Sequence, residues 1–157
     1  MNESPKKELP NPLDYAMKLL GVRHYSEYEL CQKLQKKGYT IREINSALVD
    51  CMRYGFINDE LYAKDYANNL SAKGYGKFVI VRKLREKRIA EPLIDSALSQ
   101  IATPLENAKR SFDFKIRMLK TEKDPKKHRE KLYRFMLTRG FSSDVIRQLY
   151  DDYLNCK

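Results

Sequence analysis

One apolar pattern is repeated three times along this chain, at a spacing of about fifty residues. The first copy consists of Leu30, Leu34, Tyr39, Ile44 and Leu48. The second consists of Ile80, Leu84, Ile89, Ile94 and Leu98, and the third of Leu132, Met136, Phe141, Ile146 and Tyr150. A fixed period in this range is typical of repeat proteins, which present extended binding surfaces more often than one deep catalytic pocket.

Capping patterns divide each copy into helices. The patterns that mark helix starts are Asn11-Pro12, Ser26-x-x-Glu29, Thr40-x-x-Glu43, Asn58-Asp59, Thr103-Pro104-x-Glu106, Asp124-Pro125 and Ser142. The glycines expected to end helices are Gly38, Gly55, Gly74 and Gly140. No stretch alternates with period two between hairpin turns, so no strand is predicted.

These boundaries predict an all-α fold of three tandem three-helix repeats, each containing a helix–turn–helix pair, in an elongated, curved array. The predicted segments are a disordered tail at 1–10 and repeats at 11–57, 58–102 and 103–157. In each pair the apolar residue of the turn is expected to fill the corner between the helices; these residues are Tyr39, Ile89 and Phe141. The polar stretch 121–127 is the expected flexible link.

Positive charge is concentrated in the second and third repeats. The 157 residues have a net charge of +10, yet residues 1–70 carry ten basic and ten acidic side chains. Residues 71–90 carry seven basic and one acidic, and residues 109–139 carry twelve and four. Such clustering is typical of proteins that bind nucleic acid or acidic proteins. The alternative, a charged face that only aids solubility, is disfavoured by the neutral first repeat.

No membrane-spanning or secretory segment is expected. No apolar run approaches the ~18 residues that a spanning helix needs, and the N-terminal residues lack an apolar signal core. Cys31, Cys51 and Cys156 show no C-x-x-C spacing, which disfavours disulfides and structural zinc. We therefore expect a cytoplasmic protein, with a monomer as the default because nothing indicates a stable oligomer.

Residues suited to enzymatic chemistry do not form a motif. The histidines, His24 and His128, belong to different repeats, which disfavours a metal site or a catalytic triad. Gly74-Tyr75-Gly76-Lys77 follows a predicted helix and leads into Phe78, so we interpret it as a helix end and turn instead of a phosphate-binding loop. We expect no catalytic residue, no metal and no cofactor, and hence no enzyme.

The basic residues of the second and third repeats form the candidate binding surface. They are Lys73, Lys77, Arg82, Lys83, Arg85, Arg88, Lys109, Arg110, Lys115 and Arg117. Ile80 and Leu84 are expected to bury one side of the fifth helix and leave its cations in water. Tyr75 and Phe78 lie beside these cations. Phe78 is predicted to be a core residue because its neighbours are apolar; stacking on unpaired bases is the alternative.

Two motifs carry a resemblance to a known family. Residues 23–38 follow the pattern R-x-x-S-x-x-E-L-x-x-K-L-x-x-K-G, and residues 55–63 follow G-hydrophobic-hydrophobic-N-D-x-x-Y-A. Together with Lys73-Gly74-Tyr75-Gly76 and Ile80-x-x-x-Leu84, they resemble the RecX regulators of the bacterial RecA recombinase over roughly residues 13–102. Asn58 stands where the family has an acid, and Arg88 stands where it has a glycine, so that turn is either tighter or has a positive φ at Arg88.

This resemblance implies a non-enzymatic regulator of RecA in homologous recombination, DNA repair and the SOS response of the bacterial cytoplasm. Such a protein would lie along the groove of the RecA filament on single-stranded DNA, or block filament growth. The implied partners are the RecA filament and single-stranded DNA, with duplex DNA as the alternative. The basic residues above are the candidate contacts.

A second hypothesis is a helix–turn–helix protein of the transcription-factor type, which binds duplex DNA. Each repeat contains a suitable helix pair. However, the second helices of the pairs, at residues 42–53, 91–100 and 144–153, are not the basic ones. A reader of specific base pairs should concentrate Arg, Lys, Asn and Gln at the start of that helix.

Overall fold

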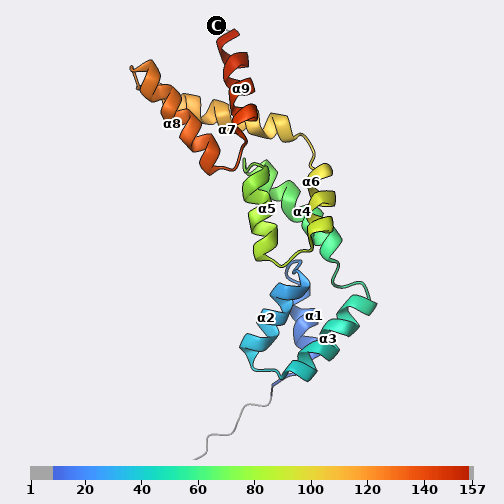
Figure 1. The fold of residues 1–157 in the computed structure, drawn as a ribbon. Coiled ribbons are helices and arrows are strands. Elements are labelled where there is room, and N and C mark those ends of the chain that lie inside the picture. Colours follow the sequence, from blue (N-terminus) through green and yellow to red (C-terminus); the bar gives the residue numbers. More distant parts are fainter. Residues whose placement is uncertain (1–8, 156–157) are drawn as a thin grey trace, which may run out of the picture. The chain divides into compact units, whose positions relative to one another are not determined.

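The described residues 9–155 of the computed structural model are helical and contain no strand (Figure 1), which confirms the all-α prediction for this part of the chain. The helices are α1 (Pro12–Leu20), α2 (Glu27–Lys37), α3 (Ile41–Arg53), α4 (Asp59–Ala72), α5 (Lys77–Glu86), α6 (Glu91–Ser99), α7 (Pro104–Met118), α8 (Pro125–Thr138) and α9 (Ser143–Asn155). The tail predicted at 1–10 lies, apart from Leu9 and Pro10, outside the described residues, as does Cys156.

Most of the predicted helix caps are confirmed. The side chain of Asn11 accepts a hydrogen bond from the Leu13 backbone N–H at 2.9 Å. The capping boxes of Ser26 with Glu29 and of Thr40 with Glu43 are both complete. Glutamate at the third helical position thus caps the N-termini of α2 and α3 in the same way.

The capping box predicted at Thr103 is wrong. Thr103 adopts a left-handed backbone conformation, with φ of 49°, and its side chain makes no capping hydrogen bond. A capping side chain needs extended backbone to reach the third helical N–H, and the left-handed conformation turns it away. The proline that follows does not account for this conformation, because it favours extended backbone for the residue before it, as Asn11 and Asp124 show before Pro12 and Pro125. Pro104 itself opens α7 as expected.

The turn at Arg88 has the positive φ that was one of the two alternatives. Its φ is 58°, where glycine would be unstrained. A side chain in this region costs roughly 1–2 kcal/mol, so the turn geometry is retained at a local energetic cost. The three corner residues of the helix pairs are buried as predicted; they are Tyr39, Ile89 and Phe141.

The first compact unit ends at Tyr62 and contains α1, α2 and α3. Helix α1 packs mainly on α3, and α2 packs on both. Leu30, Leu34 and Cys51 are fully buried in its core. Because the apolar residues of α2 and α3 recur every three to four positions, each helix presents one continuous stripe to this core.

Glu29 is a buried carboxylate at the edge of this first core, with only 9% of its surface exposed. Its Oε2 accepts a hydrogen bond from the Tyr62 hydroxyl at 2.9 Å and one from the Ser26 backbone N–H at 3.4 Å. Its Oε1 lies 3.4 Å from the Arg23 guanidinium. The carboxylate of Glu29 therefore joins three other residues of the two RecX-like motifs, Arg23, Ser26 and Tyr62, and these contacts explain the spacing of the motif residues.

The second compact unit runs from Ala63 and contains the rest of the described chain. Its two groups of helices are joined by backbone hydrogen bonds. The Gly76 N–H donates to the Arg139 carbonyl at 2.8 Å, and the Phe78 N–H donates to the Gly140 carbonyl at 3.1 Å. We call this pairing of residues 76–78 with residues 139–140 the glycine clasp. It brings the turn before α5 against the turn after α8.

The glycine clasp leaves no room for side chains on its backbone. A Cβ atom on Gly76 would lie 2.4 Å from the Gly140 carbonyl oxygen. One on Gly140 would lie 2.5 Å from the Val79 backbone nitrogen. Real Cβ atoms do not approach other atoms this closely, so both positions require glycine for contact between the backbones.

The prediction that Phe78 is a core residue is wrong. Its side chain is 62% exposed, whereas Val79, Ile80 and Leu84 form the buried stripe of α5. At 100° per residue, position 78 lies far from the centre of that stripe, and the clasp fixes its backbone at the surface. Phe78 borders an open, largely apolar hollow of about 570 Å³ between α5, α6 and α7, which we call the α5–α7 hollow.

Replacement of Phe78 by alanine should therefore change the stability little, within about 0.5 kcal/mol, as for most surface substitutions. Ile80→Ala on the same helix should cost about 2–5 kcal/mol because it opens a cavity in the core. Urea denaturation followed by circular dichroism measures both free energies of unfolding. Equal losses for the two variants would contradict the observed orientation of α5.

Candidate nucleic-acid interface

Cations and aromatic rings alternate across the second compact unit. The Lys83 ammonium lies 5.9 Å from the centre of the Tyr75 ring, and the Arg139 guanidinium lies 5.1 Å from the same ring. Arg139 also lies 5.1 Å from the Phe135 ring, which has the Lys115 ammonium at 5.1 Å. We call these five residues the cation–aromatic row. Each contact falls within the ~6 Å range of cation–π attraction.

Arg139 is the centre of this row and is fixed by the backbone. Its Nη1 donates a hydrogen bond of 2.9 Å to the Lys73 carbonyl and a longer one of 3.5 Å to the Gly74 carbonyl. These carbonyls directly follow the C-terminus of α4. The helix dipole is negative there, and backbone carbonyls without a partner in the helix need hydrogen-bond donors. A guanidinium has five N–H donors, so Arg139 retains others for a ligand.

A cavity of about 270 Å³ opens beside Arg139, between the end of α4, helix α7 and helix α8. We call it the α4–α7–α8 pocket. Its charged, aromatic and amide lining residues are Lys73, Asn107, Arg110, Phe114, Phe135 and Arg139. The pocket therefore combines three cations, two aromatic rings and one amide, which are the groups that hold phosphates and bases in nucleic-acid-binding proteins.

Several predicted cations lie exposed and without an ion pair in the part of the chain that the structure describes. They are Lys73, Lys77, Lys109 and Arg117. Lys83 and Lys115 belong to the cation–aromatic row, and Arg110 bonds to the side-chain oxygen of Asn107. Lys73 and Arg110, which are 37 residues apart, meet at the α4–α7–α8 pocket.

Two predicted cations of α5 are partly neutralised by acids. Arg85 donates from Nε at 2.6 Å and from Nη2 at 3.0 Å to the two carboxylate oxygens of Glu91. The hydrogen bond from Arg85 lowers the pKa of Glu91, so this pair stays charged at neutral pH. Arg82 lies 3.8 Å from Glu86. Because acid partners occupy them, these arginines contribute less attraction for phosphate than the unpaired lysines.

Sequence reasoning missed Arg139 and Phe114 as candidate site residues. Arg139 falls at the end of α8, far along the chain from Tyr75 and Lys73, so only the tertiary contact identifies it. Phe114 carried a local signal, because it lies four residues after Arg110 and thus on the same face of α7. A search for aromatic residues at helical spacing from the predicted cations would have found it.

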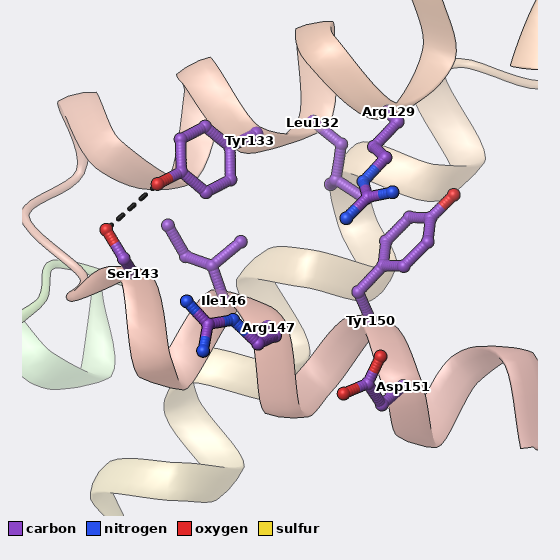
Figure 2. A pocket seen from close by; sticks show the side chains of 8 residues that line it. All are labelled: Arg129, Leu132, Tyr133, Ser143, Ile146, Arg147, Tyr150 and Asp151. Atoms are coloured by element: carbon purple, nitrogen blue, oxygen red, sulfur yellow. Dashed lines mark hydrogen bonds between the residues drawn. The ribbon is translucent and has the colours of Figure 1, made fainter. Parts of the chain in front are cut away.

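A second hollow, of about 180 Å³, lies between α8 and α9, as Figure 2 shows, and we call it the α8–α9 hollow. Tyr133 and Ser143 are joined across it by a hydrogen bond of 2.9 Å between their hydroxyls. The Arg129 guanidinium lies 5.2 Å from the centre of the Tyr150 ring. Asp151 adds a negative charge to the lining, so this hollow suits an anion less well than the α4–α7–α8 pocket.

No group of three or more His, Cys, Asp or Glu side chains among the described residues is placed to hold a metal ion. None of the described helices is both long enough and apolar enough to cross a bilayer.

The fold and this site define a class, that of helical-repeat proteins with a cationic, aromatic interaction surface. Three family descriptions match the chain in succession. They are the first three-helix domain of RecX over residues 13–51, the second over 58–98 and the third over 115–149. Each match falls inside one of the three predicted repeats. The chain belongs to the RecX family, which confirms the resemblance and the three three-helix domains.

Curated relatives agree with this assignment. Regulatory protein RecX of Legionella pneumophila (strain Corby) is 34% identical over 142 residues, which cover 88% of this chain and 92% of the relative. Regulatory protein RecX of Vibrio campbellii is 35% identical over 132 residues, 83% of this chain and 84% of the relative. The domain boundaries at 57/58 and 102/103 stay predictions, since the two compact units divide within α4.

Two solved structures share the fold. A crystal structure of regulatory protein RecX superposes with a TM-score of 0.81 at 24% identity, covering 89% of this chain and 71% of the other. The crystal structure of RecX from Lactobacillus salivarius gives a TM-score of 0.77 at 19% identity, covering 90% and 93%.

Proposed function

We propose that this protein is a non-enzymatic regulator of RecA filaments on single-stranded DNA, acting in recombination, repair and the SOS response. It binds along the filament groove as a monomer in the bacterial cytoplasm and lowers the ATP hydrolysis and strand exchange of RecA. Membership of a family of regulatory proteins supports the regulatory role. Three linked domains favour a polymeric partner, because each domain's weak contact raises the effective concentration of the next.

The observation that carries this proposal is the grouping of cations and aromatic rings on the second and third domains. A partner that contains single-stranded DNA offers both phosphates and unstacked bases. Phosphates attract the unpaired lysines, and bases stack on exposed rings. The neutral first domain is then available for contacts with protein.

The alternative, a reader of duplex DNA, is less consistent with the same surface. The helices that would enter a major groove are α3, α6 and α9. Helix α6 carries no basic residue, and α9 carries Arg147 against three aspartates. Arg147 also lines the α8–α9 hollow (Figure 2) and is not at the start of its helix. Recognition helices of specific DNA readers concentrate their basic and amide side chains at that start.

The double variant Lys77→Gln/Lys109→Gln tests this proposal. Both lysines are exposed and belong to the candidate surface. We expect weaker inhibition of DNA-stimulated ATP hydrolysis by RecA of the same organism. We also expect the slope of log affinity against log salt, for the complex with RecA-coated single-stranded DNA, to fall by ~1.4, since each lost phosphate contact removes ~0.7.

The matched control is Lys33→Gln/Lys36→Gln on α2, which removes the same charge from exposed lysines of the neutral domain. Its salt slope should equal that of the unchanged protein. Unaffected RecA turnover in the presence of the unchanged protein, together with a sequence-specific footprint on duplex DNA, would support the alternative function instead.

A further inference from the structure

We propose that the α4–α7–α8 pocket binds one unpaired nucleotide, with the base against Phe114 and its phosphate against Lys73 and Arg110. This proposal rests on the proposed function, because it names the part of the filament that the basic surface contacts. It adds a specific ligand, a single flipped or unstacked nucleotide of single-stranded DNA, to a surface that charge alone would describe only as attractive to phosphate.

The pocket is a built feature of the fold. Asn107 and Ser111 of α7 face the end of α4, where the Asn107 amide donates to the Ser71 hydroxyl at 3.0 Å and the Ser111 hydroxyl donates to the Gly74 carbonyl at 3.3 Å. Arg110 and Phe114 follow these residues by three positions each. They therefore lie beside the same contact, at the open edge of the pocket.

Arg110 is held in position before any ligand binds. Its Nη2 donates to the side-chain oxygen of Asn107, while the amide nitrogen of Asn107 is engaged with α4. The guanidinium thus loses little conformational freedom on binding an anion, which improves affinity. Its remaining N–H donors suit the bidentate geometry that phosphate oxygens accept.

The charge of the lining favours an anionic ligand. Lys73, Arg110 and Arg139 line the pocket, and none of its lining residues is acidic. The two other hollows described above differ in this respect. Asp95 lines the α5–α7 hollow, and Asp151 lines the α8–α9 hollow of Figure 2. A phosphate group would therefore be attracted most strongly to the α4–α7–α8 pocket.

The two aromatic rings of the pocket have different roles. Phe135 is half-buried and already has two cations near its ring, those of Lys115 and Arg139. Phe114 is 48% exposed at the edge, so its ring has a surface available for a base. At about 270 Å³ the cavity is smaller than the ~300–1,000 Å³ of typical ligand sites, which suits a single planar group.

Base stacking in duplex DNA restricts the ligand of this pocket to a nucleotide of single-stranded DNA. In duplex DNA both faces of each base are covered by stacking neighbours, so a ring such as Phe114 can stack only on a base that has left the helix. An acidic peptide would use the same cations but would gain nothing from the exposed phenylalanine. The combination of ring and cations therefore favours the nucleotide over the peptide.

The test uses the full chain and two fluorescent oligomers of equal length, one of thymidylate and one of abasic sites with the same phosphates. Binding is measured by anisotropy in the absence of RecA. Phe114→Ala should weaken binding of the thymidylate oligomer by about 5- to 100-fold and leave the abasic oligomer unaffected, because only the stacked base is lost. Phe114→Tyr should bind the thymidylate oligomer as tightly as the unchanged protein, since it retains an aromatic ring.

Matched controls separate this pocket from general surface effects. Phe56→Ala removes a ring of similar exposure, 44%, from the first domain and should change neither affinity. Arg110→Gln should weaken both oligomers alike and lower the salt slope by ~0.7. Arg147→Gln, which removes an exposed arginine of the α8–α9 hollow, should leave the slope unchanged.

Two results would overturn the proposal. One is an equal loss of affinity for both oligomers in Phe114→Ala while circular dichroism shows an intact helical fold. The other is an unchanged thymidylate affinity in both Phe114→Ala and Arg110→Gln, together with weaker binding of a polyglutamate peptide by Arg110→Gln, which would assign the pocket to acidic protein. If Phe114→Ala loses its helical signal, Phe114→Leu, which retains the apolar contact but not the stacking ring, replaces it with the same expectation for the two oligomers.

Failure of the pocket and failure of the proposed function are distinguishable. A protein that discriminates thymidylate from abasic oligomers through Phe114 but leaves RecA turnover unchanged would retain the pocket and contradict the filament role. A protein that inhibits RecA equally with and without the Phe114 ring, and shows no such discrimination, would retain the filament role and contradict the pocket.

Discussion

Gly76→Ala should destabilise the second compact unit by about 3–5 kcal/mol. The new Cβ atom would lie 2.4 Å from the Gly140 carbonyl oxygen and 2.6 Å from the Phe141 backbone nitrogen. Both are backbone atoms, so no side-chain rotation relieves the overlap, and overpacking of this kind typically costs 1–3 kcal/mol or more. Separation of the two segments of the glycine clasp would also weaken two backbone hydrogen bonds, at about 0.5–1.5 kcal/mol each.

The backbone conformation at position 76 is not itself the obstacle. Gly76 has φ of −88°, which any residue adopts, so the expected loss comes from contact alone. Gly21→Ala is the matched control, because its φ is −67° and its nearest atoms would lie at 3.5 and 3.6 Å. Where glycine is replaced without strain, alanine commonly stabilises a protein by about 0.4–1 kcal/mol.

Thermal and urea denaturation followed by circular dichroism measure the Tm and the free energy of unfolding of these two variants. For a unit of this size, 3 kcal/mol corresponds to a fall in Tm of about 12 °C or more. Similar midpoints for Gly76→Ala and Gly21→Ala would contradict the close contact of the clasp.

Glu29→Ala should destabilise the first compact unit by about 3 kcal/mol. The substitution removes the acceptor of the buried Tyr62 hydroxyl and of the Ser26 backbone N–H, and it leaves Arg23 without its carboxylate. Hydrogen bonds to charged groups contribute about 1.5–3 kcal/mol, and donors left unsatisfied in a buried site add to the loss. The lost ion pair with Arg23 contributes little to this destabilisation, because the Arg23 side chain is half exposed and screened by solvent.

Glu43→Ala is the matched control for the capping role of Glu29. Glu43 occupies the same position of its own capping box, at the start of α3, but it is exposed, and among the described residues its hydrogen-bond partners are the Thr40 backbone N–H and hydroxyl. Its replacement should cost clearly less. A double-mutant cycle between Glu29→Ala and Tyr62→Phe should give a coupling of about 1.5–3 kcal/mol. Equal losses for the two glutamates would mean that Glu29 acts as a cap alone.

Local sequence rules predicted the helices well, since caps and periodicity act over a few residues. Asn11, Ser26 and Thr40 cap their helices because neighbouring residues determine the conformation of a cap. Thr103 is the exception, because its left-handed backbone turns the side chain away from the helix, and nothing in the local pattern distinguishes it from Asn11, which caps its helix before a proline. Phe78 was misplaced for a different reason: apolar neighbours do not reveal which of several adjacent apolar residues faces the core.

The candidate site was only partly predictable. Charge counts identified the domains that carry the cations, and Lys73 and Arg110 do meet at one pocket. Their meeting, however, depends on the hydrogen bonds of Asn107 to Ser71 and of Ser111 to Gly74, which join residues 36 and 37 positions apart. Arg139, which completes the pocket, lies 66 positions from its partner Lys73. Nothing in the local pattern indicates such contacts. The pairing of Arg85 with Glu91 is local, at six positions, but it crosses the turn between α5 and α6, so the i, i+3 and i, i+4 rules for one helix do not indicate it.

The hydrogen bond of the Glu29 carboxylate also limits where the chain can be truncated to give an N-terminal fragment. Its Tyr62 partner lies in α4, beyond the boundary at residue 57 that repeat counting predicts. A recombinant fragment that stops at Ile57 would remove the Tyr62 hydroxyl from this carboxylate at the edge of the core and leave it with the Ser26 backbone N–H and Arg23 among its described donors. An expression plan for the N-terminal portion therefore needs to extend at least through Tyr62, and past it if the helix that carries this tyrosine is to remain wound.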